Sequence, residues 1–193
     1  MTVIQNQYFD GERPLYESRD LHLERVTIGE GESGLKESRR VKAVDCRFEG
    51  MYVIWECEDV ECLNCHFAAS DRAPMWYVRR IKLNDCTLDA PKAFREIDGL
   101  TIERTQMNDA SEAFWRCRDG QISDLYIKNA HYPFFQSERM TIRDLHLQGK
   151  YAFQYTRNIE LHNAVLDTKD TFWNSEDVTI YDSEINSEYL GWY

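Results

Sequence analysis

Four residues near position 60 have the types and spacing that could bind a metal or a haem. Cys57, Cys62, Cys65 and His66 form the pattern C-x4-C-x2-C-H. Thiolates at such spacing are typical zinc ligands, and the last five residues match the attachment motif of c-type haem. The sequence offers no second CxxC or HxxxH pair to complete a zinc site, and short motifs often match by chance. We therefore expect no metal and no cofactor here.

A second motif is typical of enzymes that act on acidic polysaccharides. Arg80, Ile81 and Lys82 form the tripeptide RIK, which in polygalacturonase-like enzymes helps to bind substrate carboxylates. The other motifs of those enzymes are absent, and no pair of carboxylates for glycoside hydrolysis can be assigned. The catalytic residues are therefore unknown, and we expect a protein without enzymatic activity. If the protein is an enzyme, a polysaccharide lyase or a glycoside hydrolase is the class to expect.

All five tryptophans share one position in a repeat of about 20 residues. The expected ligand or partner site consists of this column and the outward charges beside it: Trp55, Trp76, Arg95, Trp115, Phe135 and Trp173, with Glu56, Glu96 and Arg116. A row of outward rings could stack on sugars or contact a protein, and Arg95 could add cation–π contacts. The alternative, which we prefer, is that the rings stack on one another and cover the backbone at a corner.

These positions follow from an apolar pattern that recurs at intervals of 19 to 21 residues. We call the first apolar position of each pattern the lead residue. The lead residues are Leu21, Val41, Val60, Ile81, Leu100, Gly120, Met140, Ile159 and Val178. Apolar residues two positions apart follow each lead residue, which is typical of short strands with alternate side chains facing inward. The repeat predicts an all-β fold, a parallel β-helix of about nine coils.

Three further columns agree with this register. Six residues before each lead residue stands an apolar residue, which is Phe in the last five coils. Four residues after it, seven of nine coils have Asp or Asn, which tolerate the left-handed backbone of a sharp corner. Two residues before it, the charge alternates in sign from Arg39 onward, as expected for attraction between stacked strands. We interpret these columns as structural.

The composition limits the partners. The chain has 193 residues and a net charge of -11, so nucleic acid and anionic membranes are not expected partners. The N-terminal sequence resembles no signal peptide and no segment is apolar enough to span a bilayer, so we expect a cytoplasmic protein with reduced cysteines. We predict one domain over residues 1–193, with a cap and first partial coil at 1–18 and stacked coils at 19–193 that end in mid-coil.

Several segments resemble a known family. They are ERPLYESRDLHL from Glu12, GLKESRRV from Gly34, GKYAFQY from Gly149, DTKDTFW from Asp167 and EYLGWY from Glu188. They resemble an uncharacterised, mainly bacterial family known as domain of unknown function 3737. The resemblance implies a right-handed, single-stranded β-helix of the pectin-lyase-like type, and it implies no activity and no functional residues.

Relatives typically continue for several more coils beyond the position where this chain stops. Open coil ends present unpaired strand edges, so we expect self-association through them, as a homo-oligomer. For the function we expect a non-catalytic binding or scaffold module with a protein or glycan partner. The alternative is a carbohydrate-binding or carbohydrate-active protein of the pectin-lyase-like type.

Overall fold

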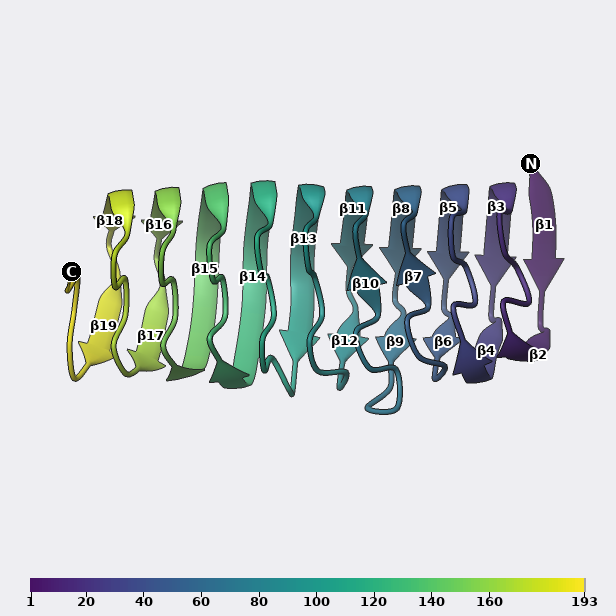
Figure 1. Ribbon diagram of the computed structural model, residues 1–193, viewed down its shortest axis with the longest axis horizontal. Helices are drawn as coiled ribbons and strands as arrows, with labels where there is room; N and C mark the ends of the chain where they lie inside the picture. Colours follow the sequence, from purple (N-terminus) through teal and green to yellow (C-terminus); the bar gives the residue numbers. More distant parts are fainter. Residues whose placement is uncertain (193) are drawn as a thin grey trace.

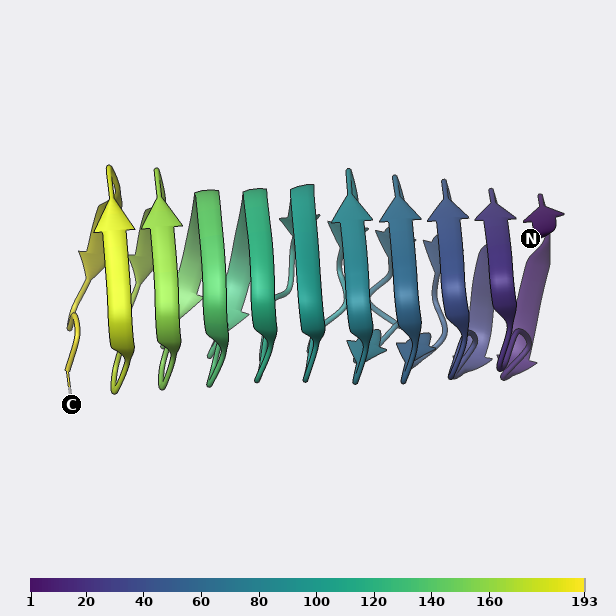
Figure 2. The same cartoon turned by 90° about the horizontal axis from the view of Figure 1, so that it is seen from above.

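The strands of successive turns lie directly side by side along one axis (Figures 1 and 2). This computed structural model describes residues 1–192, and Tyr193, the last residue of the predicted domain, lies outside the described part. Seventeen strands form one sheet, two short strands form a second, and every pairing is parallel. The parallel β-helix predicted from the repeat is confirmed.

The strands fall into three groups around each turn. Those that contain a lead position are β1 (Thr2–Gln5), β3 (Arg19–Glu24), β5 (Arg39–Val44), β8 (Glu58–Leu63), β11 (Arg79–Asn84), β13 (Asp98–Met107), β14 (Arg118–His131), β15 (Glu138–Lys150), β16 (Arg157–His162) and β18 (Glu176–Tyr181). The second group is β2 (Tyr8–Glu12), β4 (Thr27–Glu32), β6 (Arg47–Phe48), β9 (His66–Phe67), β12 (Thr87–Leu88), β17 (Val165–Thr168) and β19 (Glu184–Ser187). The third group is β7 (Ile54–Trp55) and β10 (Met75–Trp76). Strands β13, β14 and β15 continue around the corner and belong to the first two groups at once.

The solenoid has about ten turns, one more than the nine predicted. The additional turn lies in residues 1–18, where we expected a cap and a partial coil. Thr2 pairs with Leu21, so β1 occupies the lead position of a complete first turn. A polar residue at that position, exposed at the end of the stack, hid this turn from the apolar pattern.

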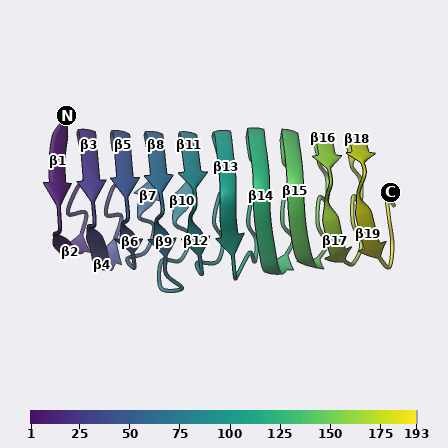
Figure 3. The ribbon, with the colours of Figure 1, turned by 180° about the vertical axis from the view of Figure 1, so that it is seen from behind.

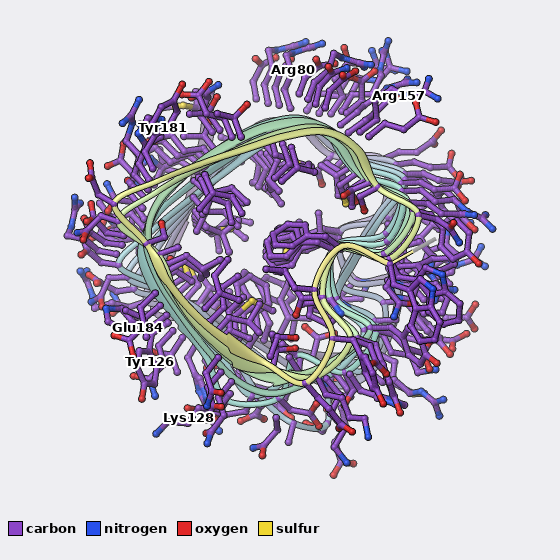
Figure 4. The ribbon with its side chains drawn as sticks, turned by 90° about the vertical axis from the view of Figure 1, so that its left-hand side faces the viewer. Arg80, Tyr126, Lys128, Arg157, Tyr181 and Glu184 are labelled. Carbon is purple, nitrogen blue, oxygen red and sulfur yellow. The ribbon has the colours of Figure 1, made fainter. Side chains whose placement is uncertain are left out.

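The screw sense follows from the view down the axis, in which the C-terminal end faces the viewer (Figure 4). Arg157 and Arg80 precede their lead residues and lie at the upper right and top. Tyr181 lies at the upper left and Glu184 lower on the left. The chain therefore runs counterclockwise while it advances toward the viewer, which is a right-handed screw.

The columns predicted from the sequence lie where the register places them. The seven Asp and Asn residues four positions after a lead residue have φ values between 47° and 55°, so they form the left-handed corner. The charge column brings Arg79 against Glu58 at 2.6 Å and Arg118 against Asp98 at 2.8 Å. Such exposed pairs are worth up to about 1 kcal/mol each, so they support register more than stability.

The core is a continuous interior filled by the inward columns. Phe94, Phe114, Phe134 and Phe153 are fully buried, and their ring centroids stack at 4.7, 4.3 and 4.5 Å. The backbone of these phenylalanines is left-handed rather than extended, with φ values between 55° and 63°. From Phe94 onward, the residues of this inward aromatic column therefore lie at turns of the chain. Among the described residues, no helix is long and apolar enough to cross a membrane.

Candidate functional site: the aromatic corner

The tryptophan column stands on a corner that short strands hold in place. In β7 and β10, Ile54 and Met75 face the core, and the next residues, Trp55 and Trp76, point outward. The residue after each tryptophan has a left-handed φ, 56° at Glu56 and 59° for the equivalent tyrosine. The chain turns there, and the two rings lie half-buried on its outer side. We call Trp55, Trp76, Arg95, Trp115 and Phe135 the aromatic corner.

The members of the aromatic corner are packed against one another along the axis, with their ring planes tilted. The ring centroids of Trp55 and Trp76 are 5.0 Å apart, and those of Trp115 and Phe135 are 5.2 Å apart. The Arg95 guanidinium joins the two pairs, at 4.1 Å from the Trp76 ring and 4.7 Å from the Trp115 ring. The expected cation–π contacts are therefore present. The faces of Trp76 and Trp115 are covered by their neighbours in the column.

The indole N–H groups are also engaged. Trp76 Nε1 donates a hydrogen bond to the Lys92 carbonyl oxygen at 2.8 Å, and Trp115 Nε1 donates to that of Tyr132 at 2.8 Å. Lys92 and Tyr132 occupy one column, eight residues before a lead residue, with left-handed φ values of 59° and 54°. This column was not among those predicted from the sequence. The next position, seven residues before a lead residue, faces the crowded interior and holds mostly small residues and prolines. That pattern was the signal from which the column could have been predicted.

Arg95 is the one charged member of the aromatic corner. Its side chain is only 19% exposed and lies 3.3 Å from Glu112, which also binds Lys92 at 2.9 Å. The Arg95 Nε atom is buried and makes no hydrogen bond. The guanidinium is weakly hydrated and flat, so it can fill a ring-sized position between two indoles.

Of the other predicted site residues, Glu96 and Arg116 line a hollow of about 420 Å³ together with Tyr77, and no member of the aromatic corner lines it. Glu56 pairs with Lys36 at 3.4 Å, and Arg116 pairs with Glu96 at 3.2 Å, so these charges form rungs of a ladder. Trp173 is separated from the corner by the buried Gln154. It lies instead beside a hollow of about 190 Å³, lined by Asp170, Thr171, Trp173, Tyr189 and Trp192.

Two exposed tyrosines flank the corner. Tyr77 is 39% exposed and its ring lies 5.4 Å from that of Trp55. Tyr155 is 47% exposed and lies 5.5 Å from Phe135. Neither was predicted, because the column that contains them is mostly charged. The exposed surface at the corner therefore includes these two tyrosine side chains.

The cysteine and histidine motif is separate from the aromatic corner, because its thiols face the core. Cys57, Cys62 and Cys65 are buried in the core, and all six cysteines are free. Burial raises the pKa of the Cys57 thiol to about 12. His66 Nε2 contacts Asp89 at 2.7 Å and its other ring nitrogen contacts Arg47, so both nitrogens are engaged. Within residues 1–192, no three His, Cys, Asp or Glu side chains are placed to hold a metal ion.

The fold and this corner define a repeat protein of the parallel β-helix class. The chain belongs to the family described as "Protein of unknown function (DUF3737)", whose model matches residues 2–193. No curated protein matches the chain.

Several solved structures are similar over nearly the whole chain. The plasmid-mediated fluoroquinolone resistance protein QnrB1 is 10% identical, with 96% of this chain and 94% of that chain covered and a TM-score of 0.38. HetL, a pentapeptide repeat protein from the cyanobacterium Nostoc, is 9% identical, with coverages of 94% and 86% and a TM-score of 0.30. The Streptococcus pneumoniae surface protein and adhesin PfbA is 9% identical, with coverages of 99% and 65% and a TM-score of 0.30. Scores this low carry no conclusion about the present chain.

Proposed function

We propose that this protein is a non-catalytic binding or scaffold module that contacts a protein partner through the aromatic corner. The observation that carries the proposal is the position of Arg95 between Trp76 and Trp115, at 4.1 and 4.7 Å from their rings. A sugar stacks on a free ring face, and these faces are covered. Ring edges, tyrosines and Arg are the groups on which protein contacts depend most.

The stiffness of the corner supports the same proposal. Each ring is held by its neighbours, and two indoles are held by backbone carbonyls of the following turn. A partner that binds here immobilises few side chains, so little conformational entropy is lost on association.

A second candidate function is carbohydrate binding or a carbohydrate-directed activity, which the pectin-lyase-like type implied by the family resemblance would favour. The observation that supports it is the hollow beside Trp173, whose ring is 42% exposed, in contrast to the half-buried indoles of the corner. A glycan array probed with the intact protein tests this candidate. Binding that disappears in Trp173→Ala would support it over the protein-binding proposal.

The main proposal is tested by site-specific photo-crosslinking in cells that express the protein. A benzophenone amino acid replaces Tyr77, which flanks the corner. The control replaces Tyr126, a tyrosine of similar exposure at 44% on another side of the turn (Figure 4). We expect an adduct with one defined protein at position 77 and none at position 126. Equal adducts at both positions, or none at 77, would refute the proposal.

A further inference from the structure

A charge pattern on the face of the lead strands is not explained by the ladder described above. Three outward columns flank each lead residue, at two positions before, one before and one after it. In three consecutive turns, the charges within each turn have the same sign: Arg39, Arg40 and Lys42 are positive, Glu58, Asp59 and Glu61 negative, and Arg79, Arg80 and Lys82 positive. We call these nine residues the striped face. It lies over β5, β8 and β11 (Figure 2).

Ladder pairing requires alternation only along each column. Arg80 binds Asp59 at 2.6 Å, and Lys42 approaches Glu61 at 4.0 Å. These two contacts would be the same if neighbouring columns alternated out of step. One further contact, that of Arg80 with Glu58 in the neighbouring column at 2.6 Å, favours columns that run in step.

Later turns show the out-of-step arrangement. Arg118 is followed by Asp119, and Glu138 by Arg139. Arg139 binds Asp119 of the preceding turn at 2.7 Å and also contacts its own neighbour Glu138. Charges there attract both along and across the columns, whereas in the striped face adjacent like charges repel each other. Within each turn of the striped face, like charges therefore lie side by side, and the contact of Arg80 with Glu58 offsets that repulsion at one position.

The striped charges are accessible. The side chains of Arg40, Asp59 and Arg80 are 53%, 41% and 54% exposed. The lead side chains point inward, so a shallow depression runs between the charged columns. It has a volume of about 530 Å³ and spans the turns from Arg40 to Asp119. In the view down the axis, Arg80 points away from the ribbon into solvent (Figure 4).

We propose that the striped face binds a second copy of this chain, face to face, with the two helix axes antiparallel. A symmetric dimer has a two-fold axis. If that axis ran parallel to the solenoid axis, each turn would face the same turn of the other copy. Every stripe would then face a stripe of the same charge. If it runs across the solenoid, between the turns of Val60 and Ile81, the negative stripe of one copy faces the positive stripe of the other. The turn of Val41 then faces that of Leu100, which carries Asp98. The turn of Leu21 faces that of Gly120, where Arg19 meets Arg118 and Asp20 meets Asp119, so the charge attraction comes from the four central turns.

The size of this contact is sufficient for a specific complex. With the axis between the turns of Val60 and Ile81, about eight turns overlap, or on the order of 38 Å at about 4.8 Å per turn. A face about 17 Å wide, or five residues, then buries roughly 1,300 Å² in total, at the lower end of the range for specific interfaces. The proposal concerns a face other than the aromatic corner and the coil ends.

The test uses two single charge reversals of the intact chain, Glu61→Lys and Lys82→Glu. Across the two-fold axis, position 61 of one copy lies opposite position 82 of the other, so each variant places like charges at both contacts. The matched control is Glu160→Lys, which makes the same change in the same column but lies beyond the overlap. Each variant is first checked by its thermal melting curve. Association is measured by sedimentation over about 1–100 μM protein in about 0.15 M salt, which screens the repulsion between two chains of net charge -11.

We expect wild type and Glu160→Lys to dimerise equally, and each of the other variants to associate at least about tenfold more weakly. An equimolar mixture of Glu61→Lys and Lys82→Glu restores association, because each contact then joins unlike charges. A change that only weakens the ladder within one chain cannot be repaired by mixing. If one variant fails to fold, Glu61→Gln or Lys82→Gln replaces it, with weakened association expected and no rescue. A monomeric wild type, dimerisation unchanged by either reversal, or a mixture no stronger than its components would overturn the proposal.

Discussion

Asp71 carries the sharpest prediction about stability. It lies in the loop Ala68–Pro74 that joins β9 to β10 and projects beyond the neighbouring turns (Figures 1 and 3). Its side chain is nevertheless fully buried, and neither carboxyl oxygen has a hydrogen-bond partner. Burial raises the pKa of this carboxyl well above its ordinary value of 3.8, and the nearby backbone amide of Val53 acts in the opposite direction. The folded protein therefore holds a proton that the unfolded chain releases.

The sign of the pH dependence follows from this difference. Below the unfolded pKa, both states are protonated and the stability is complete. As the pH rises toward the folded-state pKa, the native state binds one proton more than the unfolded state, so stability falls by about 1.4 kcal/mol per pH unit. Asp71→Asn keeps the shape and removes the titration. The free energy of unfolding of the variant minus that of wild type should therefore increase by up to about 1.4 kcal/mol per pH unit.

Urea denaturation at about pH 5, 6, 7 and 8 measures this difference. Groups that the two proteins share contribute equally to both and cancel in the subtraction. Asp85→Asn is the matched control, because Arg104 lowers the pKa of the exposed Asp85 and this carboxyl is ionised in both states throughout the range. Its difference from wild type should stay constant. A constant difference for Asp71→Asn as well would refute the reasoning.

Three further predictions concern the core, the corner and the thiols. Phe114→Ala should lower the free energy of unfolding by about 3–5 kcal/mol in urea, because its buried ring stacks on two others at 4.7 and 4.3 Å; a loss below about 1 kcal/mol would contradict the packing described. Arg95→Met keeps a similar stem but removes the cation, so a loss of about 0.5–2 kcal/mol is expected, and unchanged thermal melting would show that the cation–π contacts contribute nothing. Burial raises the pKa of Cys57 and Cys117 to about 12, so both thiols should resist a disulfide reagent at about pH 8 until urea is added, whereas rapid labelling of the native protein at either cysteine would disagree.

Much of the fold could be predicted because the repeat is a local pattern. Inward and outward positions alternate within a few residues, so Leu21, Val41 and their equivalents identify strands without any knowledge of distant contacts. The Asp and Asn residues four positions after each lead residue were predictable for the same reason. Side chains such as Asp85 and Asn64 tolerate a left-handed backbone by their own chemistry. The first turn was missed because Thr2 lies at the exposed end of the stack, where an apolar lead residue is not needed.

Other features depend on which turns meet. Phe114 has a φ of 58°, a conformation that costs a bulky residue about 1–2 kcal/mol, and only the stacked rings above and below it offset that cost. Likewise, alternation predicted that Trp76 would face outward, but it did not predict that its N–H would reach a carbonyl of the next turn. Such pairings join residues about one turn apart, and no pattern within a turn determines them.

The amino-acid sequence by itself determined the parallel β-helix, its register and the common column of the tryptophans, because burial acts on each short segment in the same way. Only the tertiary structure decided that the ring faces are closed around Arg95 and that Asp71 is buried without a partner. These are properties of contacts between turns, where the neighbours of a side chain come from a different part of the sequence.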